Sequence, residues 1–261
     1  MRTFLGKVFG VERQGFVEEF RKQGFVVESG LARGHALEGL QTLARDQLAK
    51  NIAPIEFEVD VQYPGAPKGP DAPGASTARR LLQAYNRDPA FALWATSDVL
   101  KTRLQALLGS NDVSLSLCHH NCVMTKQPGF SSATLWHQDN RYWSFDQENL
   151  ISVWLALTDE DERNGCLNVI PSSHSDAIAA ERLDSALFLR DDTTENQKMI
   201  EGAVPVSLQA GDVLFFHSRL FHAAGRNESD QTKLSLVYTY HAADNQPVVG
   251  TRSARLSSVV L

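Results

Sequence analysis

The sequence predicts a mainly β protein whose core is a double-stranded β-helix, the cupin-like jelly roll, flanked by N-terminal helices. Before Gly109, charged and apolar residues alternate at helical spacing. After Gly109, short segments alternate with a period of two and are separated by Gly and Pro. No repeat or linker interrupts the chain, so we expect one domain. Its expected parts are a helical part over about 1–110, a jelly roll over about 111–242 with an insertion at 172–201, and a tail over 243–261.

The N-terminal part contains apolar residues at helical spacing between Val11 and about Lys50. This pattern predicts two helices on either side of the extended piece "GFVVESG". Pro and Gly accumulate over 51–76, which predicts a loop. A second helical segment is expected over about 77–108, where "DPAFALW" opens one helix and Ser97 can cap another that Gly109 can end.

The second part of the chain contains about eight short strand-like segments. Those with the clearest alternation are "VSLSLCHHNCVMT", "LISVWLALT", "CLNVIP", "VPVSL", "DVLFFHS" and "KLSLVYTYH". Short strands punctuated by turn residues are typical of an all-β barrel or sandwich, and a jelly roll is the natural candidate.

Length and charge limit the class of function. A chain of 261 residues can bury a core without disulfides. Its net charge of -6 argues against nucleic-acid binding, which needs clustered Lys and Arg, so we expect a small-molecule ligand. An odd count of 3 cysteines indicates a reducing compartment, and neither a signal peptide nor a membrane-spanning apolar run is evident. We therefore expect a cytoplasmic location and no membrane partner, and the sequence leaves the oligomeric state open.

Two segments suggest a metal site. In "LWHQDNRY", His137 and Asp139 are two apart and share one face of a strand. Alone, this pair is more often a solvated polar stretch. A second segment, "AGDVLFFHSRLFHAAGRN", carries His217 and His222 near its end. Two histidines and a carboxylate on a β scaffold are typical of the facial triad that holds non-haem Fe(II), and either late histidine can complete it.

A series of motifs carries a family resemblance. "WHQD", "NGCLNVIPSSH" and "GDVLFFHSRLFHAAGRN" follow one another in this order. The series resembles the phytanoyl-CoA dioxygenase family of Fe(II)/2-oxoglutarate oxygenases over about residues 14–242. The resemblance implies that His137, Asp139 and His222 bind iron and that His217 has a scaffold role.

The resemblance also implies a site for 2-oxoglutarate. The family binds the distal carboxylate with a basic residue, usually Arg, eleven positions after the last ligand, and Lys233 stands there. Lys keeps the charge but loses the planar fork of Arg. Ser235 faces the same way and can add a hydroxyl contact. By motif position, Lys126, Trp154 and Gln138 also lie beside the co-substrate.

Further contacts are expected from direction alone. Asn121 is expected at the co-substrate, and Asn227 is expected to tie the turn after His222. We expect the substrate to contact His120, Arg141, Tyr142 and Trp143. The alternative for the aromatic residues is core packing.

Two other motifs have simpler explanations. "CHHNC", from Cys118 to Cys122, invites a zinc site, but alternation splits its side chains between two faces and no second Cys pair completes a ligand set. We expect a strand lining the core instead. His174, which closes "PSSH", is expected to be a structural cap.

The resemblance implies a hydroxylase that uses Fe(II), 2-oxoglutarate and O2 on a C–H bond and releases succinate and CO2. Halogenating relatives carry a small residue where Asp139 stands, so hydroxylation is favoured. The Pro-Gly loop over 63–75 is expected to act as a lid. The alternatives are a non-catalytic or redox-neutral metal-binding jelly roll of the cupin type, and an acyl-CoA hydroxylase.

Overall fold

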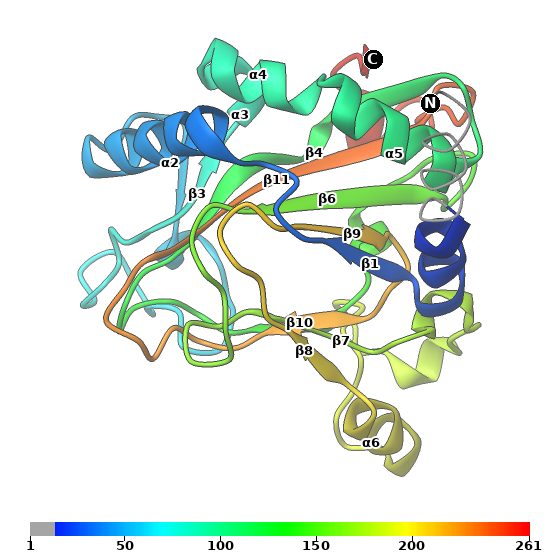
Figure 1. Ribbon diagram of the computed structural model, residues 1–261. Coiled ribbons are helices and arrows are strands. Elements are labelled where there is room, and N and C mark those ends of the chain that lie inside the picture. The colour runs from blue at the N-terminus through cyan, green and yellow to red at the C-terminus, as the bar shows by residue number, and fades with distance from the viewer. Residues whose placement is uncertain (1–13) are drawn as a thin grey trace.

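In the computed structural model, which describes residues 14–261, two antiparallel β-sheets face each other (Figure 1). The large sheet has the strand order β1-β9-β6-β11-β4-β3-β2, with β12 also paired to β4, and the small sheet has the order β5-β10-β7-β8. The strands are β1 Phe25–Glu28, β2 Ile55–Phe57, β3 Ala78–Leu82, β4 Val113–Lys126, β5 Thr134–His137, β6 Leu150–Ala156, β7 Leu167–Val169, β8 Val204–Val206, β9 Val213–His217, β10 His222–Ala224, β11 Lys233–Ala242 and β12 Val259–Val260.

The helices lie mainly in the first part of the chain. They are residues 14–23, α2 Gly34–Ala49, α3 Ala84–Arg87, α4 Pro89–Ala95, α5 Asp98–Leu108 and α6 Thr194–Glu201. The 3-10 helices are η1 Glu58–Asp60, η2 Asp139–Tyr142, η3 Ser173–Ser175, η4 Ala180–Arg182 and η5 Arg252–Ala254. None of the helices within 14–261 is long and apolar enough to cross a membrane. Most of the N-terminal segment in which we looked for a signal peptide lies outside the described residues.

The jelly-roll core is confirmed, although its strands form two facing sheets and do not close into a barrel. All six segments with clear alternation are strands (β4, β6, β7, β8, β9 and β11). The short β5 and β10 complete the small sheet, and they are the two strands that carry the predicted histidine ligands.

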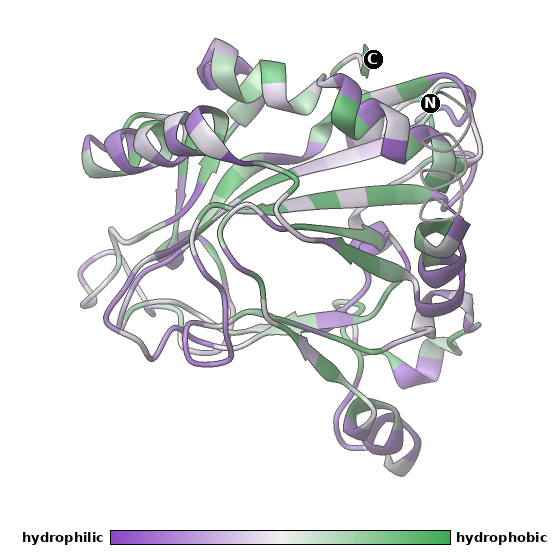
Figure 2. Cartoon of the chain, viewed as in Figure 1, coloured by the Kyte–Doolittle hydropathy of each residue, from purple (hydrophilic) through white to green (hydrophobic). Residues whose placement is uncertain are grey.

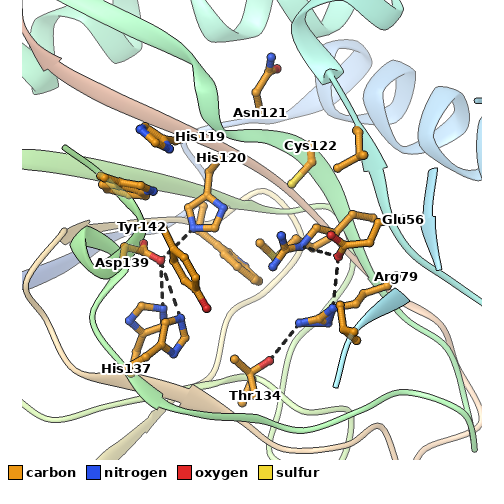
Figure 3. Close-up of a pocket in the computed structure, with 18 of the residues that line it drawn as sticks. Glu56, Arg79, His119, His120, Asn121, Cys122, Thr134, His137, Asp139 and Tyr142 are labelled. Carbon is orange, nitrogen blue, oxygen red and sulfur yellow. Dashed lines mark hydrogen bonds and ion pairs between the residues drawn. The ribbon is translucent and has the colours of Figure 1, made fainter. Parts of the chain in front are cut away.

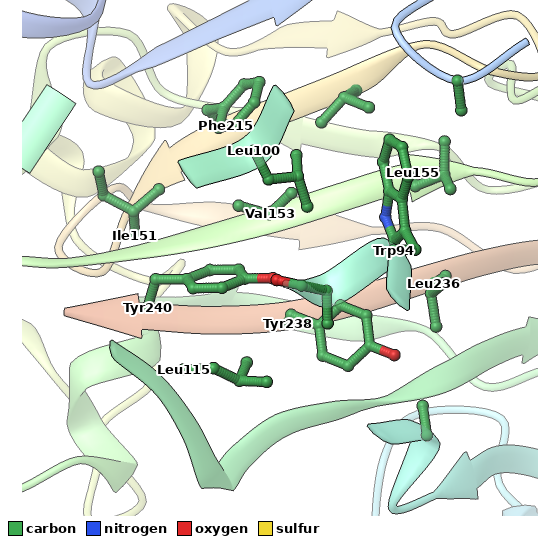
Figure 4. Close-up of a cluster of buried hydrophobic side chains, with 14 of the residues drawn as sticks. Trp94, Leu100, Leu115, Ile151, Val153, Leu155, Phe215, Leu236, Tyr238 and Tyr240 are labelled. Carbon is green, nitrogen blue, oxygen red and sulfur yellow. The ribbon is translucent and has the colours of Figure 1, made fainter. Parts of the chain in front are cut away.

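Helices α2, α4 and α5 cover the outer face of the large sheet (Figure 1). Between them lies the larger hydrophobic core, in which Leu100 of α5 packs with Val153 and Phe215 of the sheet (Figure 4). Two buried tyrosines of β11 satisfy their hydroxyls on the helix layer, because Tyr238 Oη donates to Phe91 O and Tyr240 Oη donates to Ala95 O. Strands β1, β6 and β9 are largely hydrophobic, whereas the helices mix both kinds of residue (Figure 2).

A second hydrophobic cluster lies on the inner face of the large sheet, toward the small sheet. It includes Trp154, Phe216 and Val237 of the large sheet with Leu167 and Val169 of the small sheet. The predicted site residues border this cluster, so the space between the two sheets is where the chemistry must be sought.

We expected a helical segment over about 77–108, but its first residues form a strand. Residues Ala78–Leu82 form β3, which pairs with both β4 and β2. The strand β2 itself lies within the expected loop 51–76. Pairing with the long β4 satisfies the backbone groups of "ARRLL", so tertiary context overrides the helical pattern of the residues that follow.

Strand β4 carries a wide bulge that matters for the site. Tyr238 of β11 pairs with Asn121 of β4, whereas the next residue, Thr239, pairs with Ser116. Residues 117–120 therefore leave the ladder and bend the strand. The bend brings His119 and His120 to the wall of the space between the sheets.

The insertion and the tail are both structured. Residues 172–201 hold η3, η4 and α6, which lies below the small sheet in Figure 1. The tail returns to the large sheet, where β12 pairs with β4.

Candidate metal centre

His137, Asp139 and His222 form one buried cluster whose ligand atoms all lie within 4.8 Å of one another. Strands β5 and β10 run antiparallel with His137 directly opposite His222. Asp139 follows two residues later, at the first position of η2. Direct cross-strand partners have closely spaced side chains, so the register brings the two imidazoles together, with their ring centroids 4.2 Å apart.

Hydrogen bonds orient both imidazoles toward the aspartate. His137 Nδ1 lies 2.8 Å from Leu135 O, and His222 Nδ1 lies 3.0 Å from Leu220 O. A carbonyl oxygen only accepts, so each Nδ1 must carry a proton, and in the neutral imidazole Nε2 then keeps its lone pair. The two Nε2 atoms lie 3.8 Å and 3.7 Å from Asp139 Oδ1. This is the arrangement in which backbone groups fix metal-ligating histidines.

Two further side chains hold the Asp139 carboxylate. His120 Nε2 lies 3.0 Å from Oδ1, and Ser152 Oγ donates to Oδ2 over 2.8 Å. Burial by itself would raise the pKa of the Asp139 carboxyl, but the charge and the hydrogen bond of His120 lower it well below its ordinary value. Burial lowers the pKa of His120, and the Asp139 carboxylate more than offsets this and raises it to about 9. Asp139 is therefore held as the anion that a cation requires.

The donor set fits ferrous iron. Two neutral imidazole nitrogens and one carboxylate oxygen converge from one side, and this facial set is the one that non-haem Fe(II) oxygenases use. Burial lowers the pKa of His137 to about 3, with His222 adding to the effect, so His137 is neutral at physiological pH and can act as a ligand.

The cluster lies at the wall of a cavity of about 620 Å³ between the two sheets. His137, Asp139 and His222 all line it, as do Trp154 and Lys233 of the large sheet. Figure 3 shows Asp139 and His137 on one side of this space and Glu56 and Arg79 on the other. A volume of this size is typical of a pocket for a small ligand.

Lys233 faces the interior as the alternation predicted, but it already has a partner. Its Nζ lies 3.0 Å from Glu160 Oε2, and both side chains are almost completely buried. Ser235 Oγ and Trp154 Nε1 donate to the other oxygen of the same carboxylate over 2.6 Å and 2.9 Å. Three residues that we predicted at the co-substrate therefore converge on one internal carboxylate.

Lys126 also lines the cavity, and its ammonium donates to the backbone carbonyls of Ser132 and Gly225. Burial lowers the pKa of Lys126 to about 7, and the nearby charge of Lys233 adds to this shift. Lys126 and Lys233 are direct partners in the β4–β11 ladder. The two lysines thus lie side by side at one end of the cavity.

The other two predicted co-substrate residues have structural partners. Gln138 Nε2 donates to the carbonyl of Arg219. Asn121 Oδ1 accepts from the backbone N–H of Tyr85 in α3 over 2.7 Å. In Figure 3 the Asn121 side chain lies apart from Asp139 and His137. Both contacts stabilise the scaffold around the cavity.

Of the predicted substrate residues, His120, Tyr142 and Trp143 line the cavity. Arg141 instead stacks its guanidinium over the Phe188 ring at 3.7 Å. Tyr142 Oη lies 3.3 Å from Tyr63 Oη, so the Pro-Gly loop touches the wall beside the metal cluster. This contact is compatible with the expected lid.

The remaining sequence motifs have scaffold contacts. His217 Nδ1 accepts from the Arg219 N–H over 3.1 Å, so His217 is not part of the cluster. His174 Nε2 lies 3.2 Å from Arg21 O, which ties η3 to the helix at 14–23. Asn227 Nδ2 donates to Lys126 O and Gln231 O and closes the turn after β10.

Sequence reasoning missed four charged residues around the cavity. Glu160 binds Lys233, Glu56 lies on the edge strand β2, and Arg79 and Arg80 lie on the neighbouring strand β3. The available signal for the arginines was their position in "ARRLL", because charged residues inside an apolar strand are rarely buried without a reason.

The comparisons with known proteins agree with this geometry. A family model described as phytanoyl-CoA dioxygenase (PhyH) matches residues 20–235. Phytanoyl-CoA dioxygenase 1 of Oryza sativa subsp. japonica is 29% identical over 121 residues, which are 46% of this chain and 42% of that protein. The peroxisomal phytanoyl-CoA dioxygenase of Rattus norvegicus is 22% identical over 268 residues, with 99% of this chain and 77% of the relative covered.

Solved structures share the fold. The non-heme alpha ketoglutarate dependent epimerase SnoN from nogalamycin biosynthesis superposes with a TM-score of 0.72 at 22% identity, covering 90% of this chain and 84% of that chain. EctD from S. alaskensis, solved with 2-oxoglutarate and 5-hydroxyectoine, has a TM-score of 0.73 at 21% identity, covering 89% and 77%. At these identities the likeness establishes the fold.

Proposed function

The chain belongs to the phytanoyl-CoA dioxygenase (PhyH) family, and from this premise we propose that it is an Fe(II)- and 2-oxoglutarate-dependent dioxygenase that hydroxylates a C–H bond of a small molecule. The observation that carries the proposal is the buried cluster of His137, Asp139 and His222, with both Nε2 atoms directed at one carboxylate oxygen. These three residues would hold the iron.

When bound, iron with 2-oxoglutarate and O2 supplies the oxidising chemistry that converts C–H into C–OH and releases succinate and CO2. The protein itself positions the iron ligands and shields the reacting centre. Leu135 O and Leu220 O fix the two imidazoles, while Ser152 and His120 fix the carboxylate. Ligands held in this way need no reorganisation when the metal binds.

The walls of the cavity would limit the access of water to the reacting centre. Trp143 and Tyr142 stand beside the cluster, and the Pro-Gly loop reaches them through Tyr63. We propose that this loop closes over bound substrate, as lids do in enzymes that sequester a reactive centre.

We propose that Lys126 and Trp154, which line the cavity, form the wall against which 2-oxoglutarate lies. An ammonium has three N–H donors, so Lys233 keeps two of them beyond its bond to Glu160 and can hydrogen-bond to the co-substrate. The charge of Lys233, however, is already balanced by Glu160. The other three predicted residues would support the co-substrate indirectly. Ser235 holds the Glu160 carboxylate, Gln138 holds the Arg219 carbonyl, and Asn121 holds the backbone N–H of Tyr85.

We propose a free small molecule as the substrate, with His120, Tyr142 and Trp143 at its contact surface. The size of the cavity supports this assignment. The names of the curated relatives favour an acyl-CoA as the alternative substrate. We further propose that residues 1–261 form a single domain and that the protein is cytoplasmic, which its three free cysteines support.

The test is turnover of 2-oxoglutarate. The protein is incubated with Fe(II) and 2-oxoglutarate under air, and succinate release is scored against a panel of acyl-CoA and free small-molecule candidates. Stimulated succinate release is the expected result. Activity that persists without O2 would instead identify a redox-neutral enzyme of the cupin type, and binding without any turnover would identify a non-catalytic metal protein.

A further inference from the structure

Two arginines of the C-terminal tail line the cavity that holds the metal cluster. Arg252 is the first residue of η5, and Arg255 follows its last residue with helical dihedral angles. A 3-10 helix has three residues per turn, so side chains three positions apart lie on the same face. Both side chains are exposed, so they lie at the outer part of the cavity. Neither arginine has a role in the function proposed above.

Contacts with the bulge of β4 fix this part of the tail. His119 Nε2 lies 2.8 Å from Ser253 Oγ, which also accepts from the backbone N–H of Ser144 over 2.8 Å. The backbone N–H of Leu256 donates to Cys118 Sγ over 3.1 Å. Ser253 is buried although the residues on both sides of it are exposed. The first residues of the motif "CHHNC" therefore hold the tail against the cavity.

The tail meets the cavity on the side of the metal cluster. Figure 3 shows His119 next to His120, and His120 contacts Asp139 Oδ1. His119 packs against Trp143, with ring centroids 5.1 Å apart. Burial lowers the pKa of His119 to about 3, and the charges of His120 and Arg252 add to this shift. Arg252 is therefore near the wall that we assigned to the substrate.

The two guanidiniums have no partner in the described part of the chain. Within residues 14–261, neither side chain of Arg252 and Arg255 makes a hydrogen bond or an ion pair. Like charges on one helix face repel each other, so the pair lacks a counter-charge. The other cationic side chains of the cavity contact carboxylates or backbone carbonyls of the fold, and they are Arg79, Arg80, Lys126 and Lys233.

The charges that line the cavity favour an anionic ligand. Six of the lining residues are Lys or Arg and two are Asp or Glu, although the whole chain has a net charge of -6. One of the two acidic residues is Asp139, which faces the metal site. An excess of positive charge in a cavity concentrates anions. Arginine also offers parallel N–H donors that match a carboxylate or a phosphate.

We propose that Arg252 and Arg255 together bind an anionic group of the substrate at the outer part of the cavity. The proposal rests on the proposed function and deepens it, because it defines the substrate as an organic anion. Two sources share this chemistry. The anion is either the carboxylate of a free organic acid or a phosphate of an acyl-CoA.

The position of the pair separates it from the co-substrate wall. Asn121 and Lys126 bound the regular part of the β4–β11 ladder after the bulge. A strand rises about 3.3 Å per residue, so their Cα atoms lie about 16 Å apart. The tail contacts β4 beyond Asn121, at Cys118 and His119. The arginines therefore lie toward the opposite end of the cavity from Lys126, which we placed beside 2-oxoglutarate.

Calorimetry with two matched pairs of ligands tests the proposal. The protein loaded with Mn(II) and 2-oxoglutarate is titrated with hexanoate and hexanamide, and then with hexanoyl-CoA and hexanoyl-pantetheine. The second member of each pair lacks the anionic group of the first. We expect wild type to bind the anionic member of at least one pair about 10-fold more tightly than the neutral one. A preference for hexanoate identifies a free organic acid, and a preference for hexanoyl-CoA identifies an acyl-CoA.

The double variant Arg252→Gln with Arg255→Gln should lose this preference and keep the wild-type affinity for 2-oxoglutarate. Arg252→Lys with Arg255→Lys keeps the charge but not the planar fork, so it should show an intermediate preference. The matched control is Arg45→Gln with Arg163→Gln, which removes two exposed charges outside the cavity. The control should bind all four ligands as wild type does. Thermal unfolding checks that each variant is folded.

The proposal is overturned if wild type binds neither anionic ligand more tightly than its neutral partner, or if the double Gln variant keeps the preference. A loss of 2-oxoglutarate affinity in that variant would also overturn it, because the arginines would then serve the co-substrate. Failure of the proposed function looks different. In that case wild type does not bind 2-oxoglutarate in the presence of Mn(II), and the arginines are judged from the same two pairs of ligands with Mn(II) alone.

Discussion

The ammonium of Lys233 lies 3.0 Å from the carboxylate of Glu160, and both side chains are almost fully buried although the residues are 73 positions apart. Ser235 and Trp154 donate to the same carboxylate. The residue expected to hold the far end of the co-substrate is therefore part of an internal network. The stability of the fold should therefore depend on this buried pair.

Glu160→Ala should lower the free energy of unfolding by about 3–5 kcal/mol, because it leaves the Lys233 ammonium buried without a counter-charge. The double variant Glu160→Met with Lys233→Met should recover most of this loss, since no charge is left buried. Urea unfolding of the two variants measures both effects. A single variant as stable as wild type would show that the pair contributes nothing.

Ser152→Ala should weaken Fe(II) binding about 10- to 100-fold, because Ser152 Oγ fixes the Asp139 oxygen that does not face the histidines. Anaerobic equilibrium titration with Fe(II) measures the effect. Ser114→Ala removes another buried serine hydroxyl, on β4, and should leave the affinity unchanged. Equal affinities of the two variants would contradict the role of Ser152.

Gly211→Ala should destabilise the fold by at least about 1–3 kcal/mol. Gly211 has a φ of +97°, and a Cβ there would lie 2.3 Å from Ala32 O. Gly39→Ala in α2 is the control, since a Cβ at Gly39 meets nothing within 4 Å and Ala favours the helix. Thermal unfolding that ranks Gly211→Ala above the control would refute this account of the turn.

Lys126 should make stability depend on pH. Its pKa is about 7 in the folded protein and near 10.5 in the unfolded chain, so between these values the unfolded state binds one more proton. The unfolding free energy of wild type should therefore rise with pH relative to Lys126→Met from about pH 7 upward and be flat below. Urea unfolding at several pH values tests this, with the exposed Lys68→Met as the charge control. A difference that stays constant up to pH 9 would contradict it.

The sequence predicted the metal cluster because the ligands lie in ordered motifs. His137 and Asp139 are two apart, and the series of motifs assigned His222 over His217. The structure places His217 at the end of β9, against Phe20 of the N-terminal helix. Period-two alternation also gave the correct direction for Lys233. It could not reveal Glu160, which lies after the end of β6 and meets Lys233 only through the tertiary fold.

The segment "ARRLL" was predicted to be helical, and this hid the arginines of the cavity. Its strand conformation depends on pairing with β4 and β2, which no local pattern reports. The expectation for Asn121 rested on its direction along the strand, and the bulge at 117–120 changes the alternation along β4. The bulge between β2 and β3 and the bulge in β4 together determine which side chains face the site.

The central claim is that His137, Asp139 and His222 hold one catalytic metal ion. The most direct test is an anaerobic equilibrium titration of the chain with Fe(II), repeated for His137→Ala, Asp139→Ala and His222→Ala. We predict one tightly bound Fe(II) per wild-type chain and a large loss of affinity in each variant, with the far-UV circular dichroism unchanged. Wild-type affinity in any of the three variants would contradict the claim.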